Sequence, residues 1–508
     1  MSLWARLVLA VVSGGLLALS FPPFGASLLA PVAVALLALA VRGCTPWRAL
    51  LIGAVQGAVS FGILLRWMSV VGPDAWILLT GLCAAWIALM AVAWALVGRL
   101  AWWPLWFACL WVAQEALRDR IPLGGFPWGR LAFAQTATSL TPWAAIGGAA
   151  LVTFATALAG TLMAYVVISW RAGERRWATA AAGGVLVIAL TGLLIPRPTS
   201  SESTATLAVV QGGVVSTGLS VSDERRAVFD RHISATLALA EQVDSGEVPA
   251  PRGVIWPENS VDIDPAQDPE VRAALDAAVR AVGAPILIGA VVDVDPERVA
   301  NVGIVWQESG PGDRYVKRHP VPFGEYVPFR SILTSVIGRF ALVPRDFIAG
   351  QSPGVLDLGG VTVADVICFE IAYDDIVREA VTAGGQVIVV QTNNATFAGL
   401  GQPEQQIAMS RLRAVEHGRA VLVAATSGIS AVIAPDGSMV AEIGEDGSGS
   451  LVATVALRDS LTIADRLGEI PEFALALLGA TVMGVALIRR RPNASEPSAP
   501  APAPRLTP

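Results

Sequence analysis

The chain has 508 residues, of which 54% are hydrophobic and only 15% are charged. Soluble globular proteins carry about 25% charged residues, so this composition excludes a protein surrounded only by water and indicates a part embedded in lipid. The formal net charge of −6, without blocks of like charge, argues against a nucleic-acid-binding protein. The length is sufficient for two or three domains.

Long apolar runs fill the first two-fifths of the sequence, and one more lies near its end. A membrane-spanning helix needs about 20 mostly apolar residues. The first run also has the character of a signal peptide, because Arg6 precedes an apolar stretch. Further runs follow it, however, so we predict membrane spans over 4–21, 24–41, 49–65, 75–98, 101–117, 142–169, 177–195 and 471–488.

Arginines in the short connections predict the orientation of these spans. If the N-terminus is cytoplasmic, the cytoplasmic segments hold Arg6, Arg42, Arg48, Arg99, Arg171, Arg175, Arg176, Arg489, Arg490 and Arg491, whereas the opposite short loops hold only Arg66, Arg118, Arg120 and Arg130. We therefore predict a seven-helix transmembrane domain (1–200), an extracytoplasmic domain (204–460), a returning span (471–488) and a cytoplasmic tail (489–508). The tail is rich in proline, alanine and serine and is predicted to be disordered.

The segment 204–460 alternates short β-branched runs with amphipathic stretches, a pattern typical of layered α/β domains. Strands are predicted at Leu207–Gln211, Val254–Trp256, Ile286–Val292, Val302–Trp306, Val361–Ile367, Val387–Gln391, Val421–Ala425 and Ala431–Ala434. Helices are predicted at 222–243, 268–282, 373–383 and 403–417. No glycine-rich phosphate loop follows a strand, so the sequence gives no support for a nucleotide cofactor.

Cysteine usage singles out one thiol. Cys44, Cys83 and Cys109 lie in or beside apolar segments, where a thiol usually acts as a small hydrophobic group. Cys368 stands alone in the polar part of the chain, so no disulfide framework is predicted there.

Three polar residues of this domain lie at or just past the ends of predicted strands, where α/β sheets bind ligands. Glu258 follows Val254–Trp256, Lys317 lies in Tyr315-Val316-Lys317-Arg318-His319, and Cys368 follows Val361–Ile367. A thiol accepts an acyl group as its thiolate, which a neighbouring cation favours and a carboxylate helps to form. The three side chains therefore suit a nucleophile, a stabilising charge and a proton carrier.

The residues alone leave other interpretations open. A single Glu or Lys at a strand end is more often a solvated surface charge, and a single Cys is more often core filling. His319 or His417 would form a Cys–His pair with Cys368, or would bind a metal, although no metal-binding spacing is present. The run Gln391-Thr392-Asn393-Asn394 ends another strand in polar side chains that suit a pocket.

The longer runs around these residues carry a resemblance to a known family. Glu258, Lys317 and Cys368, in this order, resemble the Glu-Lys-Cys triad of the nitrilase superfamily. The segment from Lys317 to Pro328 (KRHPVPFGEYVP), the run Cys368-Phe369-Glu370 and the loop Phe126-Pro127-Trp128, together with the many spans, are similar to the apolipoprotein N-acyltransferase family. Phe369 stands where many members have tyrosine.

The resemblance implies a multispan membrane domain joined to a nitrilase-like α-β-β-α sandwich, and a reaction without metal or cofactor. Cys368 would take an acyl chain from a phospholipid, and the N-terminal amine of a diacylated apolipoprotein would then receive it. Glu258 would act as general base and acid, and Lys317 would stabilise the oxyanion. Glu325 would hold the lysine, while the supporting or substrate-binding residues would be Phe369, Glu370, Trp128 and Asn393.

The resemblance also implies a location in the bacterial cytoplasmic membrane, with the catalytic domain on its outer face. A membrane-tethered amidase or nitrilase-type hydrolase is the first alternative, and a transporter or scaffold that only binds lipoproteins is the second. From the sequence alone we expect Lys317→Ala to abolish thioester formation while leaving the protein folded.

Overall fold

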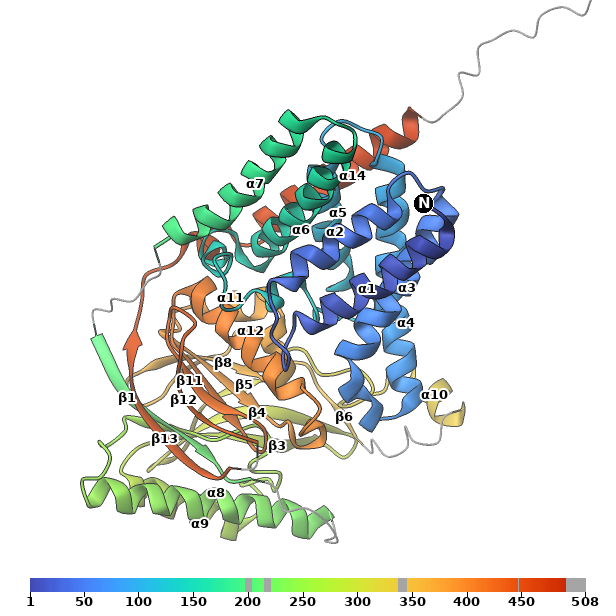
Figure 1. Ribbon diagram of the computed structural model, residues 1–508. Coiled ribbons are helices and arrows are strands. Elements are labelled where there is room, and N and C mark those ends of the chain that lie inside the picture. Colours follow the sequence, from blue (N-terminus) through green and yellow to red (C-terminus); the bar gives the residue numbers. More distant parts are fainter. Residues whose placement is uncertain (197–202, 214–220, 337–344, 446, 490–508) are drawn as a thin grey trace, which may run out of the picture.

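The computed structural model describes residues 1–196, 203–213, 221–336, 345–445 and 447–489, and it consists of a helical part and an α/β part (Figure 1). The predicted tail over 490–508 lies outside the described residues. The helical part comprises α1 (Leu3–Leu19), α2 (Leu29–Val41), α3 (Pro46–Leu64), α4 (Pro73–Val97), α5 (Trp103–Arg118), α6 (Ala144–Arg171), α7 (Arg175–Leu194) and α14 (Ile470–Ile488).

These helices overlap the predicted spans, but they differ in how well they suit a bilayer. Among the described residues, five helices are long and apolar enough to cross a membrane: α3, α4, α6 with its preceding turn, α7 and α14. The helices α1 and α2 are apolar but shorter, and α5 carries Gln114, Glu115 and Arg118. It stays a prediction that all eight segments cross the bilayer with the orientation given above.

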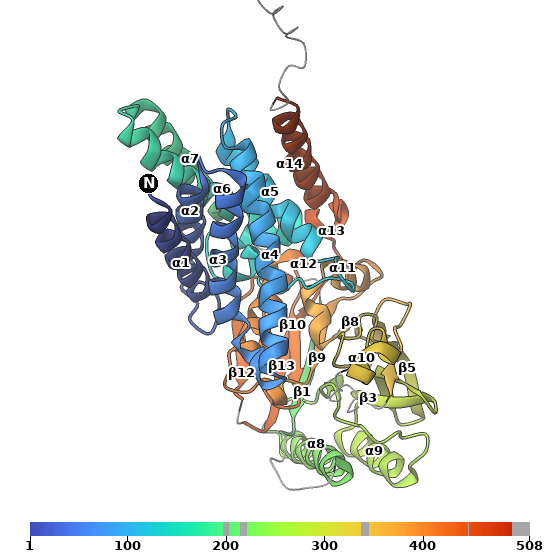
Figure 2. The ribbon, with the colours of Figure 1, turned by 90° about the vertical axis from the view of Figure 1, so that its right-hand side faces the viewer.

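The α/β part contains two sheets (Figure 2). The first has the order β13-β1-β2-β3-β4-β5, with β6 paired to β4; its strands are β13 (Gly449–Leu457), β1 (Ser203–Gln211), β2 (Gly253–Ile255), β3 (Ile286–Asp295), β4 (Arg298–Gln307), β5 (Gly310–Val316) and β6 (Asp346–Phe347). The second has the order β12-β11-β10-β9-β8-β7, from β12 (Met439–Ile443), β11 (Ser430–Ile433), β10 (Val421–Ala425), β9 (Val387–Thr392), β8 (Thr362–Ile367) and β7 (Val355–Asp357).

Helices cover both outer faces of the paired sheets. The helices α8 (Val221–Asp244) and α9 (Pro269–Val282) pack on the first sheet, while α11 (Asp374–Thr382) and α12 (Gln402–His417) pack on the second. Buried side chains from both sheets, such as Val209, Leu287 and Val363, form the core between them. This arrangement confirms the predicted α-β-β-α sandwich beside a multihelical domain.

The eight predicted strands and the four predicted helices of this domain are present, with ends shifted by a few residues. Sequence reasoning missed β5, β6, β7, β12, β13 and the short helices α10 (Arg330–Val336) and α13 (Ile463–Leu467). The central residues of β5 read Pro-Gly-Asp-Arg and are exposed, because β5 is an edge strand that has no apolar face to bury. Such a strand carries no period-2 apolar signal.

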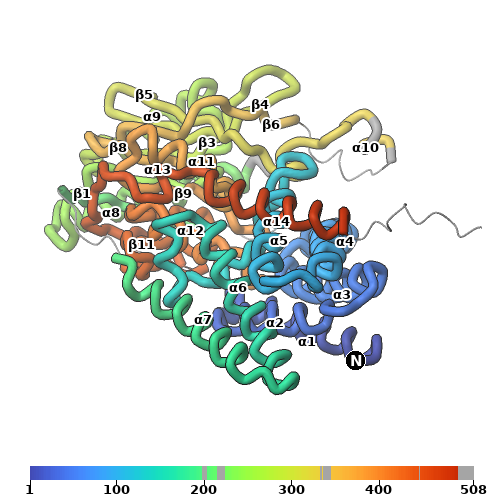
Figure 3. Tube along the Cα trace, turned by 90° about the horizontal axis from the view of Figure 1, so that it is seen from above, coloured from blue at the N-terminus to red at the C-terminus, as the bar shows by residue number. Residues whose placement is uncertain are grey.

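One helical layer of the sandwich also forms its junction with the membrane helices. Viewed from the membrane end, α12 lies beneath α6 (Figure 3), and the two helices are in contact. The Gln405 side chain of α12 donates to the backbone carbonyls of Pro22 and Leu64 at 3.2 and 3.1 Å. Its amide oxygen accepts from the indole N–H groups of Trp67 and Trp128. The junction is therefore fixed by directional bonds as well as by apolar packing.

Candidate active site

The fold brings the three candidate residues together from three strand ends. Glu258 follows β2 and Lys317 follows β5 in the first sheet, whereas Cys368 follows β8 in the second. The site thus lies where the two sheets meet at their carboxyl ends. Glu258 and Lys317 are 4% and 1% exposed, so the surface-charge interpretation of these two residues is wrong.

Lys317 is held between two carboxylates. Its Nζ donates to Glu258 Oε1 at 3.0 Å and to Glu325 Oε1 at 2.8 Å. Burial alone would lower the pKa of this ammonium, but the charges of Glu258 and Glu325 outweigh it and hold the pKa well above its ordinary value. Lys317 is consequently a fixed positive charge. An ammonium has three N–H donors, so one remains for a substrate oxygen.

Asn301, in the middle of β4, is a site residue that sequence reasoning missed. Its Nδ2 donates to Glu258 Oε1 at 2.7 Å and to Glu325 Oε1 at 3.1 Å, so it joins both carboxylates. The other oxygen of Glu258 accepts from the backbone N–H of Asn393 at 3.0 Å. Asn393 therefore contributes through its backbone, while its side chain donates to Asn259 at 3.3 Å.

Cys368 occupies a sharp turn between β8 and a five-residue 3-10 turn, η5 (Cys368–Ala372). Its φ of +56° is in the left-handed region, which a residue with a Cβ rarely adopts. Such strain is typical of functional sites and persists only when the surroundings fix it. Gln406 of α12 contributes by donating to the Cys368 carbonyl at 3.0 Å.

The structure corrects the expectation of an ionised thiol. Burial raises the pKa of the Cys368 thiol to about 12, and the Glu258 carboxylate raises it further than Lys317 lowers it. At neutral pH the resting sulfur therefore carries its proton. The same geometry places a carboxylate near enough to act electrostatically on the thiol.

Glu370 braces the turn at Cys368 against the segment that contains Lys317. Its carboxylate is fully buried and accepts from the Tyr315 hydroxyl at 2.9 Å and from the backbone N–H groups of Arg318, His319 and Ile367 at 2.6, 3.0 and 2.8 Å. Burial raises the pKa of this carboxyl group, and the hydrogen bonds oppose that rise. Glu370 thus ties residues on both sides of the site into one rigid unit.

We expect Glu370→Gln to destabilise the protein by about 3 kcal/mol and to slow its chemistry. The amide would point an N–H group at buried N–H donors, and each unsatisfied buried group costs about 1–3 kcal/mol. Thermal unfolding of the purified protein measures the first effect. Glu379→Gln is the matched control, because Glu379 is 44% exposed and pairs with the surface residue Arg318. Equal unfolding temperatures for the two variants would contradict the bracing role.

A stack of aromatic rings leads from Cys368 to the membrane domain. Phe369 stacks on Trp128 and on Phe126, with ring centroids 5.9 and 5.8 Å apart and planes within 12° and 23°. Trp128 is 1% exposed and its Nε1 donates to Gln405 at 2.6 Å. The Trp128 ring is therefore enclosed by protein. The residue lies between the turn at Cys368 and the membrane helices.

Two substitutions separate the roles of this ring. Trp128→Phe keeps the stack on Phe369 and loses one hydrogen bond, so we expect a loss of about 1 kcal/mol in stability. Trp128→Ala removes the ring and leaves a cavity, a change that costs about 3–5 kcal/mol for large aromatic side chains. Thermal unfolding and the acyl-enzyme rate of both variants check this order. A Phe variant as impaired as the Ala variant would show that the N–H group, not the ring, matters.

The two alternative histidines lie elsewhere. His319 accepts or donates at 2.7 Å to the Tyr373 hydroxyl, and His417 pairs with Asp465 at 2.6 Å. The structure shows no contact of either ring with Cys368, so a Cys–His pair finds no support. Among the described residues no group of three or more His, Cys, Asp or Glu has the arrangement of a metal site.

Comparison with known families identifies both parts of the chain. Residues 13–162 match the model of the apolipoprotein N-acyltransferase N-terminal domain, and residues 247–463 match the carbon-nitrogen hydrolase model. Fold and site therefore define a membrane protein that carries a nitrilase-type domain. An apolipoprotein N-acyltransferase of Mycolicibacterium smegmatis is 39% identical, with 94% of this chain and 85% of the relative covered. The chain belongs to the apolipoprotein N-acyltransferase family.

The chain is also similar to a second relative and to a solved structure. A protein of the same name from Methylococcus capsulatus is 30% identical and covers 96% of this chain and 97% of the relative. Among solved structures, a mutant amidase of the nitrilase superfamily from Nesterenkonia is 19% identical, covers 51% of this chain and 92% of its own, and gives a TM-score of 0.37.

Proposed function

We propose that this protein transfers an acyl chain from a phospholipid, through a thioester on Cys368, to the N-terminal amine of diacylglyceryl-cysteine in apolipoproteins. Membership of the family supports the overall reaction. The observation that carries the mechanism is the buried pairing of Lys317 with Glu258 at the strand ends beside Cys368. The protein needs no cofactor for this chemistry, because the side chains supply nucleophile, base and charge.

In the first half-reaction, Glu258 takes the thiol proton as the Cys368 sulfur attacks the ester carbonyl of the phospholipid. The carbonyl oxygen becomes an oxyanion and receives a hydrogen bond from the free N–H of Lys317. Collapse of the tetrahedral intermediate breaks the bond to the lipid glycerol oxygen. That oxygen takes the proton back from Glu258 and leaves as a lysophospholipid. Because the thiol pKa lies near 12, the proton transfer has to accompany the attack.

In the second half-reaction, the neutral α-amine of the diacylated apolipoprotein attacks the thioester carbonyl. Glu258 removes a proton from the amine as the carbon-nitrogen bond forms, and Lys317 again faces the oxyanion. The sulfur leaves and regains the proton from Glu258, which restores the resting enzyme. Both substrates occupy the same acyl site in turn, so the reaction is of the ping-pong type.

The surroundings of the site favour transfer over hydrolysis. The aromatic wall of Phe126, Trp128 and Phe369 is apolar and continuous with the membrane helices. An apolar wall accommodates acyl chains and excludes water from the thioester. We place the protein in the bacterial cytoplasmic membrane with its sandwich domain on the extracytoplasmic face, where lipid-anchored donor and acceptor are both present.

A product analysis tests this function. The purified protein is incubated with a phospholipid labelled in its acyl chain and with a synthetic diacylated lipopeptide. We expect amide-linked label on the lipopeptide, and none with Cys368→Ser. Cys44→Ser is the matched control, because Cys44 is a half-buried thiol in the membrane domain and its loss should leave transfer intact. Release of ammonia from small amides, without transfer to the lipopeptide, would favour the hydrolase alternative instead.

A further inference from the structure

Two polar side chains lie close together in the apolar core between the two sheets. Asp365 is in β8, three residues before Cys368, and Gln391 is in the neighbouring strand β9. Asp365 pairs with Val389 in the parallel register, two residues before Gln391. Successive side chains alternate between the faces of a sheet, so Asp365, Val389 and Gln391 share one face. Val389 belongs to the core between the sheets, and both polar residues are 0% exposed.

The oxygens of these two side chains meet over Gly303 of β4, in the opposite sheet. A Cβ at Gly303 would lie 2.3 Å from Asp365 Oδ2 and 2.7 Å from Gln391 Oε1. Two oxygens that lie so close to one point are neighbours. A glycine at this position therefore leaves the space that the two side chains occupy.

The orientation of the Gln391 amide is fixed at its other end. Its Nε2 donates to the backbone carbonyl of Trp256 at 2.6 Å. A carbonyl oxygen only accepts, so a flipped amide would place two acceptors against each other. Gln391 Oε1 consequently faces Asp365, and it has no donor among the described residues.

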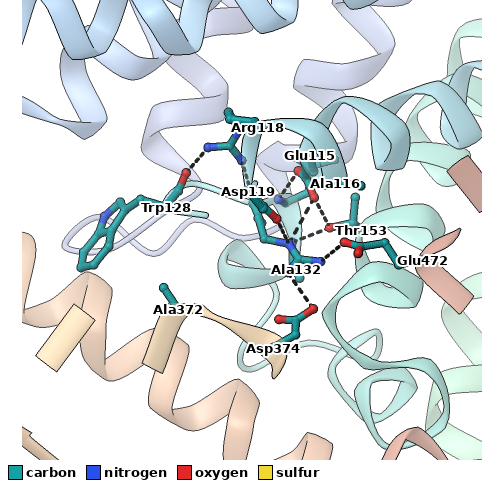
Figure 4. A network of polar contacts seen from close by, with 12 residues as sticks. Glu115, Ala116, Arg118, Asp119, Trp128, Ala132, Thr153, Ala372, Asp374 and Glu472 are labelled. Carbon is teal, nitrogen blue, oxygen red and sulfur yellow. Dashed lines mark hydrogen bonds and ion pairs between the residues drawn. The ribbon is translucent and has the colours of Figure 1, made fainter. Parts of the chain in front are cut away.

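Asp365 lacks a donor as well. Both of its carboxyl oxygens are buried without a hydrogen-bond partner in the described part of the chain. The buried carboxylates Asp119 and Asp374 at the domain junction, by contrast, lie 3.3 and 2.8 Å from Arg130 (Figure 4). Burial raises the pKa of Asp365 well above its ordinary value, and the nearby Glu370 carboxylate raises that pKa further.

We propose that Asp365 is a neutral carboxylic acid that donates its proton to Gln391 Oε1, and that this pair positions Glu258 relative to Cys368. A protonated carboxyl group has one O–H donor, so it supplies the donor that Gln391 lacks. It also removes a buried charge that no neighbour compensates. The other oxygen of Asp365 is then an uncharged acceptor, whose missing donor costs far less than a buried charge.

The pair links the strand of the nucleophile to the strand of the base, a role that rests on the proposed function. Glu258 and Cys368 come from different sheets, and the apolar packing between the sheets is not directional. Gln391 crosses this core to the carbonyl of Trp256, two residues before Glu258. Catalytic groups need to be held within about 0.5 Å of their productive positions, and a directional bond supplies that precision.

A second bond from the same strand acts in the same sense. The backbone N–H of Asn393, just past the end of β9, donates to the Glu258 carboxylate at 3.0 Å. Because β9 pairs with β8, which ends beside Cys368, a fixed β9 holds the base against the nucleophile. Loss of the Gln391 bond is therefore expected to shift Glu258 without altering its carboxylate.

Infrared spectroscopy tests the protonation state independently of any activity. The carbonyl band of a neutral carboxylic acid is separate from the bands of carboxylates. We expect the difference spectrum between the wild-type protein and Asp365→Asn at neutral pH to show the loss of one acid band. Asp293→Asn removes an exposed aspartate that pairs with Arg345, and this matched control should lose none. An Asp365→Asn spectrum that keeps every acid band would overturn the neutral acid and leave a carboxylate compensated by water.

Two variants with opposite expected results test the positioning role. Asp365→Asn keeps an N–H donor toward Gln391, so we expect acyl-enzyme formation near the wild-type rate. Gln391→Met keeps the length of the side chain and loses the bond to Trp256. We expect its single-turnover rate to fall about 10²-fold, the loss that a misplacement of ~1 Å causes. Gln267→Met is the matched control, because Gln267 is exposed and bonds to Asp293 at 3.0 Å, and its rate should be unchanged.

The pH profile separates positioning from a loss of stability. With Glu258 displaced, attack depends on the thiolate fraction, which grows about tenfold per pH unit below the thiol pKa. The Gln391→Met rate should therefore rise more steeply with pH than the wild-type rate. Asp365→Leu leaves Gln391 in place without its donor, and it should show the same steepening to a smaller extent.

The outcomes are distinguishable. A Gln391→Met rate that equals the wild-type rate, or that is reduced by the same factor at every pH, would overturn the positioning role. An Asp365→Asn rate as low as that of Asp365→Leu would overturn the donation to Gln391. A wild-type protein that shows the Asp365 acid band but forms no acyl-enzyme from any phospholipid would overturn the proposed function while supporting the neutral acid.

Discussion

Replacing Glu258 by Gln is expected to slow acyl-enzyme formation by about 10²–10⁴-fold, the range that a positioned general base contributes. The substitution keeps the size of the side chain and one of its two accepting oxygens. It removes the carboxylate that takes the thiol proton, and a thiol with a pKa near 12 needs such a base before it can attack. Single-turnover formation of the thioester from a defined phospholipid measures the effect.

The pH dependence of the residual rate adds a second readout. Without a base, the reaction depends on the small fraction of thiolate, which grows about tenfold per pH unit below the thiol pKa. Loss of the Glu258 charge lowers that pKa, but burial, the largest cause of its rise, remains. The Glu258→Gln rate should therefore increase between pH 7 and pH 10 with a slope near one.

Glu325→Gln is the matched control for this variant. Glu258 and Glu325 both pair with Lys317 and both accept from Asn301, so the two substitutions disturb the charge cluster to a similar extent. Only Glu258 is assigned the proton transfer. Equal losses in the two variants would mean that both carboxylates merely hold the lysine.

Removing the Lys317 charge is expected to impair both folding and chemistry. Lys317 is 1% exposed between two carboxylates, and removing one partner of a buried ion pair costs about 3–5 kcal/mol. Loss of an oxyanion donor costs a further 10²–10³-fold in rate, roughly. From the sequence alone we expected Lys317→Ala to leave the protein folded. The burial of Lys317 between two carboxylates argues against that expectation.

A double variant separates the two effects. Lys317→Met together with Glu325→Gln removes one positive and one negative charge, so the net charge of the cluster is unchanged. We expect it to recover most of the stability lost in Lys317→Met, as measured by thermal unfolding, and to remain unable to form the thioester. A double variant that forms the acyl-enzyme at the wild-type rate would refute the role of Lys317 at the oxyanion.

The sequence predicted the parts of this protein whose signals are local. Long apolar runs, β-branched strands and the residues at strand ends can each be recognised from neighbouring positions, and this includes Glu258, Lys317 and Cys368. The edge strand β5 escaped prediction, because its exposed Pro-Gly-Asp-Arg centre carries no apolar pattern. The pairing register between β4 and its neighbouring strands likewise cannot be predicted from the residues of β4 alone.

The missed elements of the site arise from contacts between distant segments. Asn301 lies inside β4 as one polar residue in an apolar strand, and only the folded sheet shows that it reaches Glu258 and Glu325. The raised pKa of Cys368 depends on burial, which the sequence does not contain. Trp128 could equally have been a lipid-facing ring until its contacts with Phe369 and Gln405 were known.

Mass spectrometry of the intact protein after incubation with one defined phospholipid tests the central claim most directly. The account predicts a mass increase equal to one acyl group, located on the peptide that contains Cys368 and removed by neutral hydroxylamine. The adduct should be absent from Cys368→Ser and present in Cys44→Ser. An unmodified Cys368 peptide from protein that still acylates a diacylated lipopeptide would contradict the thioester mechanism.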